Sequence, residues 1–157
     1  MAWLKRLNKE HKTFLANNET GDGTLILEEP LVFDAATSGA THVWHVKADG
    51  GKDTLYEGET FHVRVTFDDK YPFEAPAVIF EGDVPVHEHV YGNGHICMSS
   101  LYDEWSPSLT AYSICLSLQS MLNSATAKKT PPDNSRYCAS APADPRKTRW
   151  VFHDDGC

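Results

Sequence analysis

Residues 86–100, VHEHVYGNGHICMSS, hold three histidines and a cysteine within the eleven positions from His87 to Cys97. Imidazoles and thiolates bind metal ions, and a cysteine beside a base is also a nucleophile. The segment therefore has two chemical interpretations. In a third interpretation, Cys97 is an ordinary small side chain buried in the core.

The metal interpretation rests on spacing. His87 and His89 form one i,i+2 pair, and His95 and Cys97 form another, so on an extended backbone both members of a pair lie on one face. Four such ligands satisfy tetrahedral zinc. The residues between and before the pairs, however, contain nothing that would orient the ligands. We therefore predict no metal.

The nucleophile interpretation needs a thiolate, a group that stabilises it, and a donor for the oxyanion that forms when a carbonyl is attacked. Residues beside Cys97 are candidates for each role. Gly92 and Gly94 also predict a tight loop that exposes Cys97 rather than burying it.

Length and composition predict one soluble globular domain. The chain has 157 residues, 41% of them hydrophobic and 23% charged. No apolar run approaches the roughly 18 to 20 residues that span a bilayer, and the N-terminus lacks the features of a secretory signal. We therefore expect a cytoplasmic or nuclear protein with no membrane partner. In that setting the cysteines at 97, 115, 138 and 157 are expected to be free thiols.

The net charge of −8 is unevenly distributed. Residues 13–127 include 4 basic and 17 acidic residues, whereas four basic residues precede this stretch and six follow it. An acidic body argues against a nucleic-acid partner, because phosphates require a basic surface. A protein partner of complementary charge fits better.

The periodicity of apolar residues predicts an N-terminal helix, four strands and a second helix. The first helix covers residues 2–16, with an apolar face and a basic stripe of Lys5, Lys9 and Lys12. Strands are predicted at 24–29, 41–48, 60–67 and 77–82, paired sequentially as an antiparallel meander with the helix over one face.

The second helix is predicted at residues 111–122, with Ser108 or Thr110 as its cap. The sequence KKTPPDNS ends it, and one further helical turn is expected near DNSRYC. Residues 139–157 are rich in small residues, proline and charge. We therefore predict one folded domain over 1–138 and a loosely ordered tail over 139–157.

The order of several motifs resembles that of the ubiquitin-conjugating enzymes. YPFEAP at 71–76 precedes a tripeptide led by His87, Cys97 follows that tripeptide by eight residues, and Trp105 in WSPSL follows Cys97 by eight. No single motif is specific, but the ordered set is. The chain is most similar to the W type of that family, through TLYEGE, VYGNGHIC, DEWSP, KKTPPDNS and HDDGC. The match is nearly end to end and weakest in residues 17–40.

The resemblance implies the α+β ubiquitin-conjugating (UBC) fold: an N-terminal helix, a four-stranded antiparallel meander and C-terminal helices. It also implies that Cys97 accepts the C-terminal carboxyl of ubiquitin as a thioester from an ATP-using activating enzyme. No metal or cofactor is implied. By the same resemblance, Lys5 and Arg6 match the surface for the activating enzyme. The residues that match the two loops held by RING or U-box ligases are Pro72, Phe73, Ser106 and Pro107.

The chain departs from the family in two segments. Most members read His-Pro-Asn where this chain reads His87-Glu88-His89. An imidazole N–H at His89 can donate to the oxyanion as the asparagine does, although its charge changes between about pH 5 and 8. The acidic residue that family members place after the second helix to orient or deprotonate an incoming lysine has only a displaced match in Asp133. Since the W type is associated with N-terminal α-amino groups, substrates with flexible N-termini are expected.

Two other function classes remain. RWD domains resemble the same fold and share a motif like 71–76, but they bind partners without doing chemistry. RWD domains lack both the cysteine and the tryptophan that follows it, whereas this chain has Cys97 and Trp105. A cysteine protease is the other alternative, but the catalytic histidine of such enzymes usually lies far from the cysteine in sequence.

Overall fold

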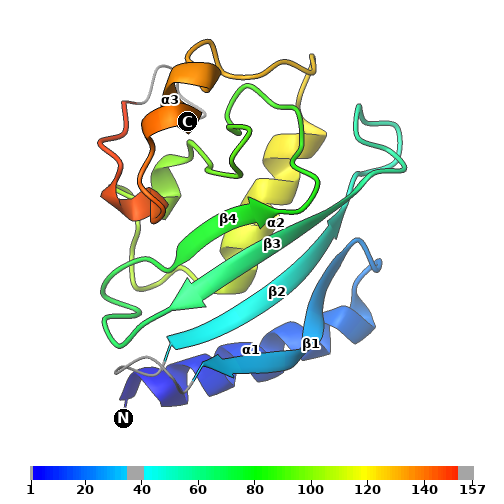
Figure 1. Cartoon of the computed structure of the whole chain (residues 1–157). Helices are drawn as coiled ribbons and strands as arrows, with labels where there is room; N and C mark the ends of the chain where they lie inside the picture. Colours follow the sequence, from blue (N-terminus) through cyan, green and yellow to red (C-terminus); the bar gives the residue numbers. More distant parts are fainter. Residues whose placement is uncertain (1, 35–40, 152–157) are drawn as a thin grey trace.

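The computed structural model describes residues 2–34 and 41–151, with the backbone alone at 29–34 and 41 (Figure 1). The helices and strands follow in the predicted order: α1 (Ala2–Thr20), β1 (Leu25–Asp34), β2 (Thr41–Asp49), β3 (Thr60–Phe67), β4 (Ala77–Glu81), η1 (Ser99–Leu101), α2 (Ala111–Asn123), α3 (Asn134–Ser140) and η2 (Pro145–Lys147). None of the helices in these ranges is long and apolar enough to cross a membrane.

The four strands form one antiparallel sheet in the order β1-β2-β3-β4, which confirms the predicted meander. The strict alternation of β3 places Phe61, Val63, Val65 and Phe67 in the core, while its other side chains are more exposed. Val63 lies opposite Val46 on one side and Phe80 on the other, and all three are buried. The pattern of apolar residues thus fixes both the register and the buried face.

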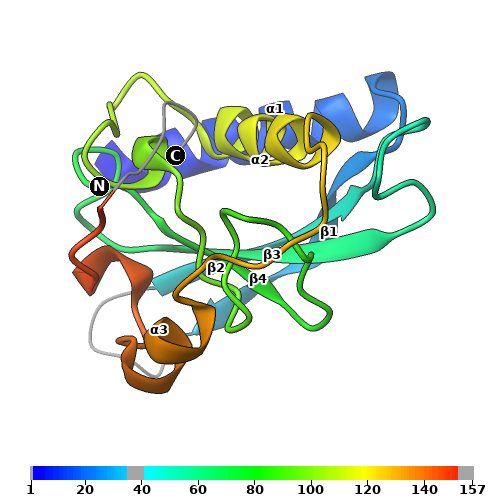
Figure 2. The ribbon, with the colours of Figure 1, turned by 90° about the horizontal axis from the view of Figure 1, so that it is seen from above.

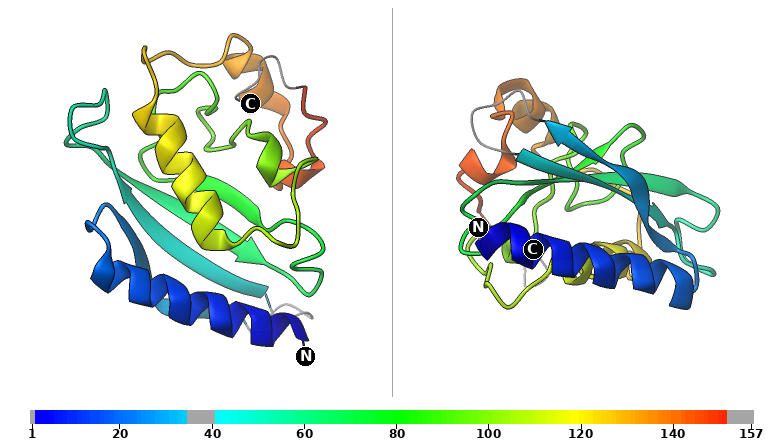
Figure 3. Two further views of the ribbon diagram at one scale, coloured as in Figure 1. Left: turned by 180° about the vertical axis from the view of Figure 1, so that it is seen from behind. Right: turned by 90° about the horizontal axis from the view of Figure 1, so that it is seen from below.

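Helices α1 and α2 lie side by side over the same face of the sheet (Figures 2 and 3). Trp3, Leu7 and Phe14 of α1 are buried against it. Lys5, Lys9 and Lys12 are exposed, as the predicted basic stripe requires.

Helix α2 buries Ile114, Leu118 and Leu122 in the same core. Its N-cap is Thr110, one of the two predicted caps. The Thr110 side chain accepts a hydrogen bond from the Ser113 backbone N–H, and the Ser113 hydroxyl accepts one from the Thr110 N–H. This reciprocal capping box starts the helix at a fixed position.

One buried carboxylate joins three parts of the fold. Glu10 of α1 accepts hydrogen bonds from Arg6 Nε at 2.6 Å, the Tyr71 hydroxyl at 2.6 Å and the Ala111 backbone N–H at 2.9 Å. Burial raises the pKa of Tyr71, as does its hydrogen bond to Glu10, so Tyr71 remains a donor. The network connects α1, the 71–76 segment and the start of α2.

Residues 144–150, which lie within the predicted loose tail, contact the rest of the domain. Arg146 contacts the carboxylates of Asp144 and Asp68 and donates to the Ala75 carbonyl at 3.0 Å. Trp150 stacks on Tyr102, with ring centroids 4.7 Å apart and planes 22° apart. One guanidinium and one indole thus hold this segment against the domain. The boundary at residue 138 stays a prediction, and residues 152–157 lie outside the described ranges.

Candidate active site

The loop that carries Cys97 is held by backbone hydrogen bonds. The Cys97 N–H donates to the His89 carbonyl at 2.8 Å, and the Phe80 N–H donates to the Gly94 carbonyl at 2.9 Å. Gly94 has a φ of +89°, and a Cβ there would lie 2.0 Å from the Phe80 carbonyl oxygen. Only glycine fits this turn. The tight loop predicted from Gly94 is therefore present, and it fixes His89 beside Cys97.

Cys97 is more covered than the sequence predicted, with 7% of its surface exposed. It packs in a small cluster with Tyr91, Tyr137, Cys138 and Trp150, because α3 and the C-terminal segment fold over the loop. The expectation that the two glycines alone would expose the thiol is therefore wrong. Access is through a pocket of about 240 Å³. Its described lining residues are Glu88, His89, Tyr91, Cys97, Lys129, Thr130, Pro131, Pro132, Asp133 and Val151.

The described cysteines differ in state. Cys115 and Cys138 are free thiols, as expected. Cys115 is fully buried, and burial raises its pKa to about 12, which makes it inert. The sulfur of Cys97 is disulfide-bonded in the structure, contrary to expectation. Because the thiolate is the reacting form, reduction must precede any thioester chemistry at Cys97.

His89 lines the same pocket as Cys97. Its backbone N–H donates to Nδ1 of His87 at 2.9 Å, and its ring Nε2 lies 3.9 Å from Glu88 Oε1. The imidazole of His89 thus lines the same pocket as the Cys97 sulfur. When a thioester on that sulfur is attacked, its carbonyl oxygen would need a hydrogen-bond donor. The oxyanion role of His89 stays a prediction.

His87 and His95 have structural partners that the sequence did not reveal. His87 Nδ1 accepts from the His89 N–H, so the Nε2–H donates to the Met121 carbonyl at 3.2 Å. His95 Nδ1 lies 2.7 Å from the Tyr137 hydroxyl. Burial lowers the pKa of both histidines, which favours neutral rings. Over residues 2–34 and 41–151, no group of three His, Cys, Asp or Glu side chains is arranged to hold a metal ion.

Asp133 lines the Cys97 pocket although it lies 36 positions away in sequence. The Tyr91 hydroxyl donates to Asp133 Oδ1 at 2.9 Å, and the Gly92 N–H donates to Asn134 Oδ1 at 2.8 Å. These two bonds attach the start of α3 to the loop that carries Cys97. The structure therefore brings together the three residues predicted as catalytic, while their roles remain predictions.

The two residues matched to the activating-enzyme surface differ in their surroundings. Lys5 is exposed on α1. Arg6 is partly buried: it binds Glu10, donates from Nη2 to the Leu109 carbonyl at 2.7 Å, and lies over the Tyr71 ring. Arg6 thus helps to hold the fold, and Lys5 is the more accessible of the pair.

The two loops matched to ligases lie next to each other. Trp105 Nε1 donates to the Pro72 carbonyl at 2.8 Å, which connects the two loops. Phe73 is 82% exposed, and Pro107 is also exposed. The Ser106 hydroxyl lies 2.9 Å from that of Ser108. Exposed apolar groups on linked loops form a surface suited to a protein partner.

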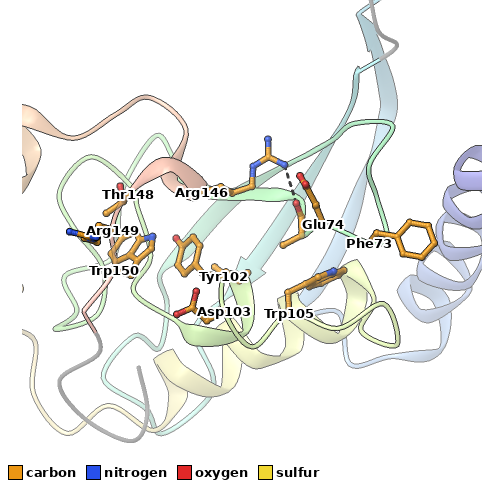
Figure 4. A pocket seen from close by; sticks show the side chains of 11 residues that line it. Phe73, Glu74, Tyr102, Asp103, Trp105, Arg146, Thr148, Arg149 and Trp150 are labelled. Atoms are coloured by element: carbon orange, nitrogen blue, oxygen red, sulfur yellow. Dashed lines mark hydrogen bonds between the residues drawn. The ribbon is translucent and has the colours of Figure 1, made fainter.

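A second pocket, of about 470 Å³, lies between these loops and the C-terminal segment (Figure 4). Phe73 and Trp105 lie at one end, and Tyr102 and Trp150 lie at the other. Arg146 lies between the two ends, where its hydrogen bond to Ala75 is drawn. The C-terminal segment therefore forms one wall of a hollow that begins at the predicted ligase surface.

Comparison with known proteins agrees with this geometry. The family model described as "Ubiquitin-conjugating enzyme" matches residues 6–149. A probable ubiquitin-conjugating enzyme E2 W-A from Danio rerio is 44% identical over 154 residues, 98% of this chain and 97% of the relative. The ubiquitin-conjugating enzyme E2 W of Caenorhabditis elegans is 46% identical over 126 residues, 80% of this chain and 83% of the relative.

Solved structures support the same conclusion. The crystal structure of the ubiquitin-conjugating enzyme E2 UbcA1 from Agrocybe aegerita aligns with a TM-score of 0.78 and 36% identity, covering 90% of this chain and 96% of that one. The UBC fold predicted from the motifs is confirmed, and the non-catalytic RWD and cysteine protease alternatives lose their support. The chain belongs to the ubiquitin-conjugating enzymes and is similar to their W-type members over most of its length.

Proposed function

We propose that this ubiquitin-conjugating enzyme transfers ubiquitin from Cys97 to the N-terminal α-amino groups of substrates with flexible N-termini. The observation that carries the proposal is the composition of the Cys97 pocket. His89 lines it at the position where most family members have asparagine, and Asp133 there already accepts a hydrogen bond from Tyr91. The residue that matches the family's lysine-activating acid is therefore already engaged by a neutral donor.

Charging of Cys97 is a thioester exchange. The Cys97 thiolate attacks the carbonyl carbon of ubiquitin's C-terminal thioester on the activating enzyme. A new C–S bond forms, the old one breaks, and the sulfur of the activating enzyme leaves as a thiolate. The tetrahedral oxyanion that forms between the two thioesters needs a hydrogen-bond donor. We propose the ring N–H of His89, which lines the same pocket, for this role.

The protonation of amines favours α-amino groups. Reference pKa values are about 10.4 for lysine and about 7.7 to 8.0 for an α-amine. At pH 7.4, about one lysine in a thousand but about a quarter of α-amines are uncharged, a difference of about 3.3 kcal/mol in nucleophile availability. Deprotonated lysine is the more basic nucleophile and recovers part of this difference. Because the neutral amine is the form that attacks, the remainder favours N-termini.

The partners follow from the surfaces described above. Lys5 and Arg6 would face the activating enzyme. Of the two, Lys5 is the more accessible to it. A RING or U-box ligase would hold the joined loops through Pro72, Phe73, Ser106 and Pro107, since Phe73 already projects from the surface. A cytoplasmic or nuclear location agrees with a site that needs reduced Cys97.

The test is a single-turnover reaction on two peptides. One is lysine-free with a free N-terminus, and the other is N-acetylated with one lysine. Mass spectrometry after incubation with activating enzyme, ATP, ubiquitin and ligase should find ubiquitin on the first peptide and little on the second. Product only on the acetylated peptide would reverse the proposal. Cys97→Ala controls for transfer that bypasses this enzyme.

A further inference from the structure

Glu88 is the residue that most sets this pocket apart, because most family members have proline there. It immediately precedes His89, whose carbonyl accepts the hydrogen bond from the Cys97 N–H. The side chains of Glu88 and Cys97 line the same pocket. The glutamate therefore adds a carboxylate to the lining of the pocket that contains Cys97.

The contacts of Glu88 are with cationic or protonatable groups. Its Oε2 lies 3.4 Å from Lys129 Nζ, and its Oε1 lies 3.9 Å from His89 Nε2. The Glu88 side chain is 44% exposed and that of Lys129 is 65% exposed. Ion pairs between such exposed groups are weak, so another cation that enters the pocket can take the place of Lys129.

Asp133, the other carboxylate among the described residues that line the pocket, is held differently. Asp133 accepts a hydrogen bond of 2.9 Å from the Tyr91 hydroxyl, and the Tyr91 ring packs on Tyr137 with centroids 4.0 Å apart. Asp133 is thus fixed by a neutral donor from an ordered aromatic cluster. Glu88 holds the mobile ammonium of Lys129 instead. Of the two carboxylates, Glu88 is the one already paired with an amine.

We propose that Glu88 is a catalytic residue of the transfer step, in which its carboxylate stabilises and then deprotonates the attacking amine. The neutral amine attacks the carbonyl carbon of the Cys97 thioester, a C–N bond forms, and positive charge develops on nitrogen. A carboxylate beside that nitrogen stabilises the charge only as it forms. Glu88 then takes the N–H proton, the C–S bond breaks, and Cys97 leaves as a thiolate.

The charged and titratable groups around this step come from two elements. Glu88, His89 and Tyr91 belong to the loop of Cys97, and Lys129 and Asp133 belong to the connection before α3. Lys129 competes with the incoming amine for Glu88. The inference rests on the proposed function, since a substrate amine must enter this pocket, but it holds for an α-amine and a lysine alike.

The experiment follows discharge of purified Cys97 thioester after the activating enzyme has been inactivated. Wild type, Glu88→Gln, Glu88→Asp and Lys129→Met are each mixed with the lysine-free peptide, the acetylated lysine peptide, or 2-mercaptoethanesulfonate. The thiol acceptor attacks as an anion and develops no positive charge, so its rate cannot fall through loss of a carboxylate that stabilises an ammonium, and it falls only if the thioester or the loop is distorted. Glu57→Gln, at an exposed position outside the pocket lining, is the matched control.

We expect Glu88→Gln to discharge to the peptide amine at least tenfold more slowly than wild type, with no reduction in its rate toward the anionic thiol. Glu88→Asp should recover part of the loss. Lys129→Met should discharge about threefold faster at low peptide concentration, because the competing ammonium is gone. Charging by the activating enzyme and the behaviour of Glu57→Gln should match wild type.

Equal amine discharge by wild type and Glu88→Gln would overturn the inference. So would an equal slowing toward amine and thiol, since that result assigns Glu88 a purely structural role. The inference would also be overturned if Lys129→Met slowed discharge to the amine as much as Glu88→Gln does. If wild type uses only the lysine peptide, the proposed function fails, and the ratio of Glu88→Gln to wild type on that peptide still decides the role of Glu88.

Discussion

The hydroxyl of Tyr91 donates a hydrogen bond of 2.9 Å to Oδ1 of Asp133, across 42 positions of sequence. Burial raises the pKa of Tyr91, as does this hydrogen bond, so the phenol stays protonated and remains a donor. The bond holds the start of α3 over the loop that carries Cys97. The lining of the Cys97 pocket therefore depends on a contact between two segments that lie far apart in sequence.

Tyr91→Phe should slow transfer from the thioester by about five- to tenfold while leaving charging unchanged. The phenyl ring keeps its packing on Tyr137, but Asp133 loses its donor, and a hydrogen bond to a charged group contributes about 1.5 to 3 kcal/mol. Single-turnover discharge measures the effect. Tyr112→Phe, whose ring packs on Phe14, is the control. Wild-type discharge in Tyr91→Phe would show that this bond does not position the site.

Glu10→Ala should destabilise the fold by about 3 kcal/mol, because it leaves Arg6, the Tyr71 hydroxyl and the Ala111 N–H without their common acceptor. Urea unfolding followed by circular dichroism gives the free energy. Glu19→Ala, at an exposed position of the same helix, should change it by less than about 0.5 kcal/mol. Similar losses in both variants would show that the network adds nothing beyond helix propensity.

Stability should fall as the pH drops below about 6.5. Burial lowers the pKa of His87 and His95 below the ordinary histidine value of 6.5, so the unfolded chain binds protons in that range while the folded chain does not. Stability is complete above pH 6.5 and is lost by up to about 1.4 kcal/mol per pH unit for each group as the pH falls toward the folded pKa.

Unfolding free energies at pH 7.0 and 5.5 test this dependence. The difference should shrink in His87→Gln and persist in His62→Gln, where the imidazole is half exposed on the outer face of the sheet. A protein that becomes more stable on acidification over this interval would contradict the assignment.

Arg146→Ala should release the C-terminal segment, because the Arg146 guanidinium bonds this segment to Asp68 and to the Ala75 carbonyl. Hydrogen exchange of backbone amides in residues 139–151 should accelerate at least tenfold. Arg149→Ala, at an exposed position of the same segment, should leave exchange unchanged. Unaltered protection in Arg146→Ala would mean that the stacking of Trp150 on Tyr102 is sufficient by itself.

Local patterns in the sequence predicted most of the fold. The alternation of Phe61, Val63, Val65 and Phe67 specified β3 and its buried face, and Thr110 was an identifiable cap. The sequence could not reveal pairings between distant residues. Glu10 has the spacing of an ordinary polar helix residue, and only the tertiary structure brings Tyr71 and Ala111 to it.

The active site was predicted in part for the same reason. Cys97 and His89 lie close in sequence, so their spacing was informative. Asp133 could be placed only once its bond to Tyr91 was known. The tail was expected to be loose because its composition is polar and rich in small residues, yet Trp150 lies in a cluster of aromatic rings beside Cys97. Composition describes the average of a segment, so it does not reveal that a single side chain, the Trp150 indole, packs against the domain.

The most direct test of Cys97 as the ubiquitin acceptor is a gel of the reduced enzyme. The protein is reduced with a phosphine, the phosphine is removed, and activating enzyme, ATP and ubiquitin are added. Wild type should form an adduct that a thiol reductant removes, Cys97→Ala should form none, and Cys97→Ser should form an ester that resists the reductant. A thiol-sensitive adduct of equal yield in Cys97→Ala would place the acceptor elsewhere and contradict the account.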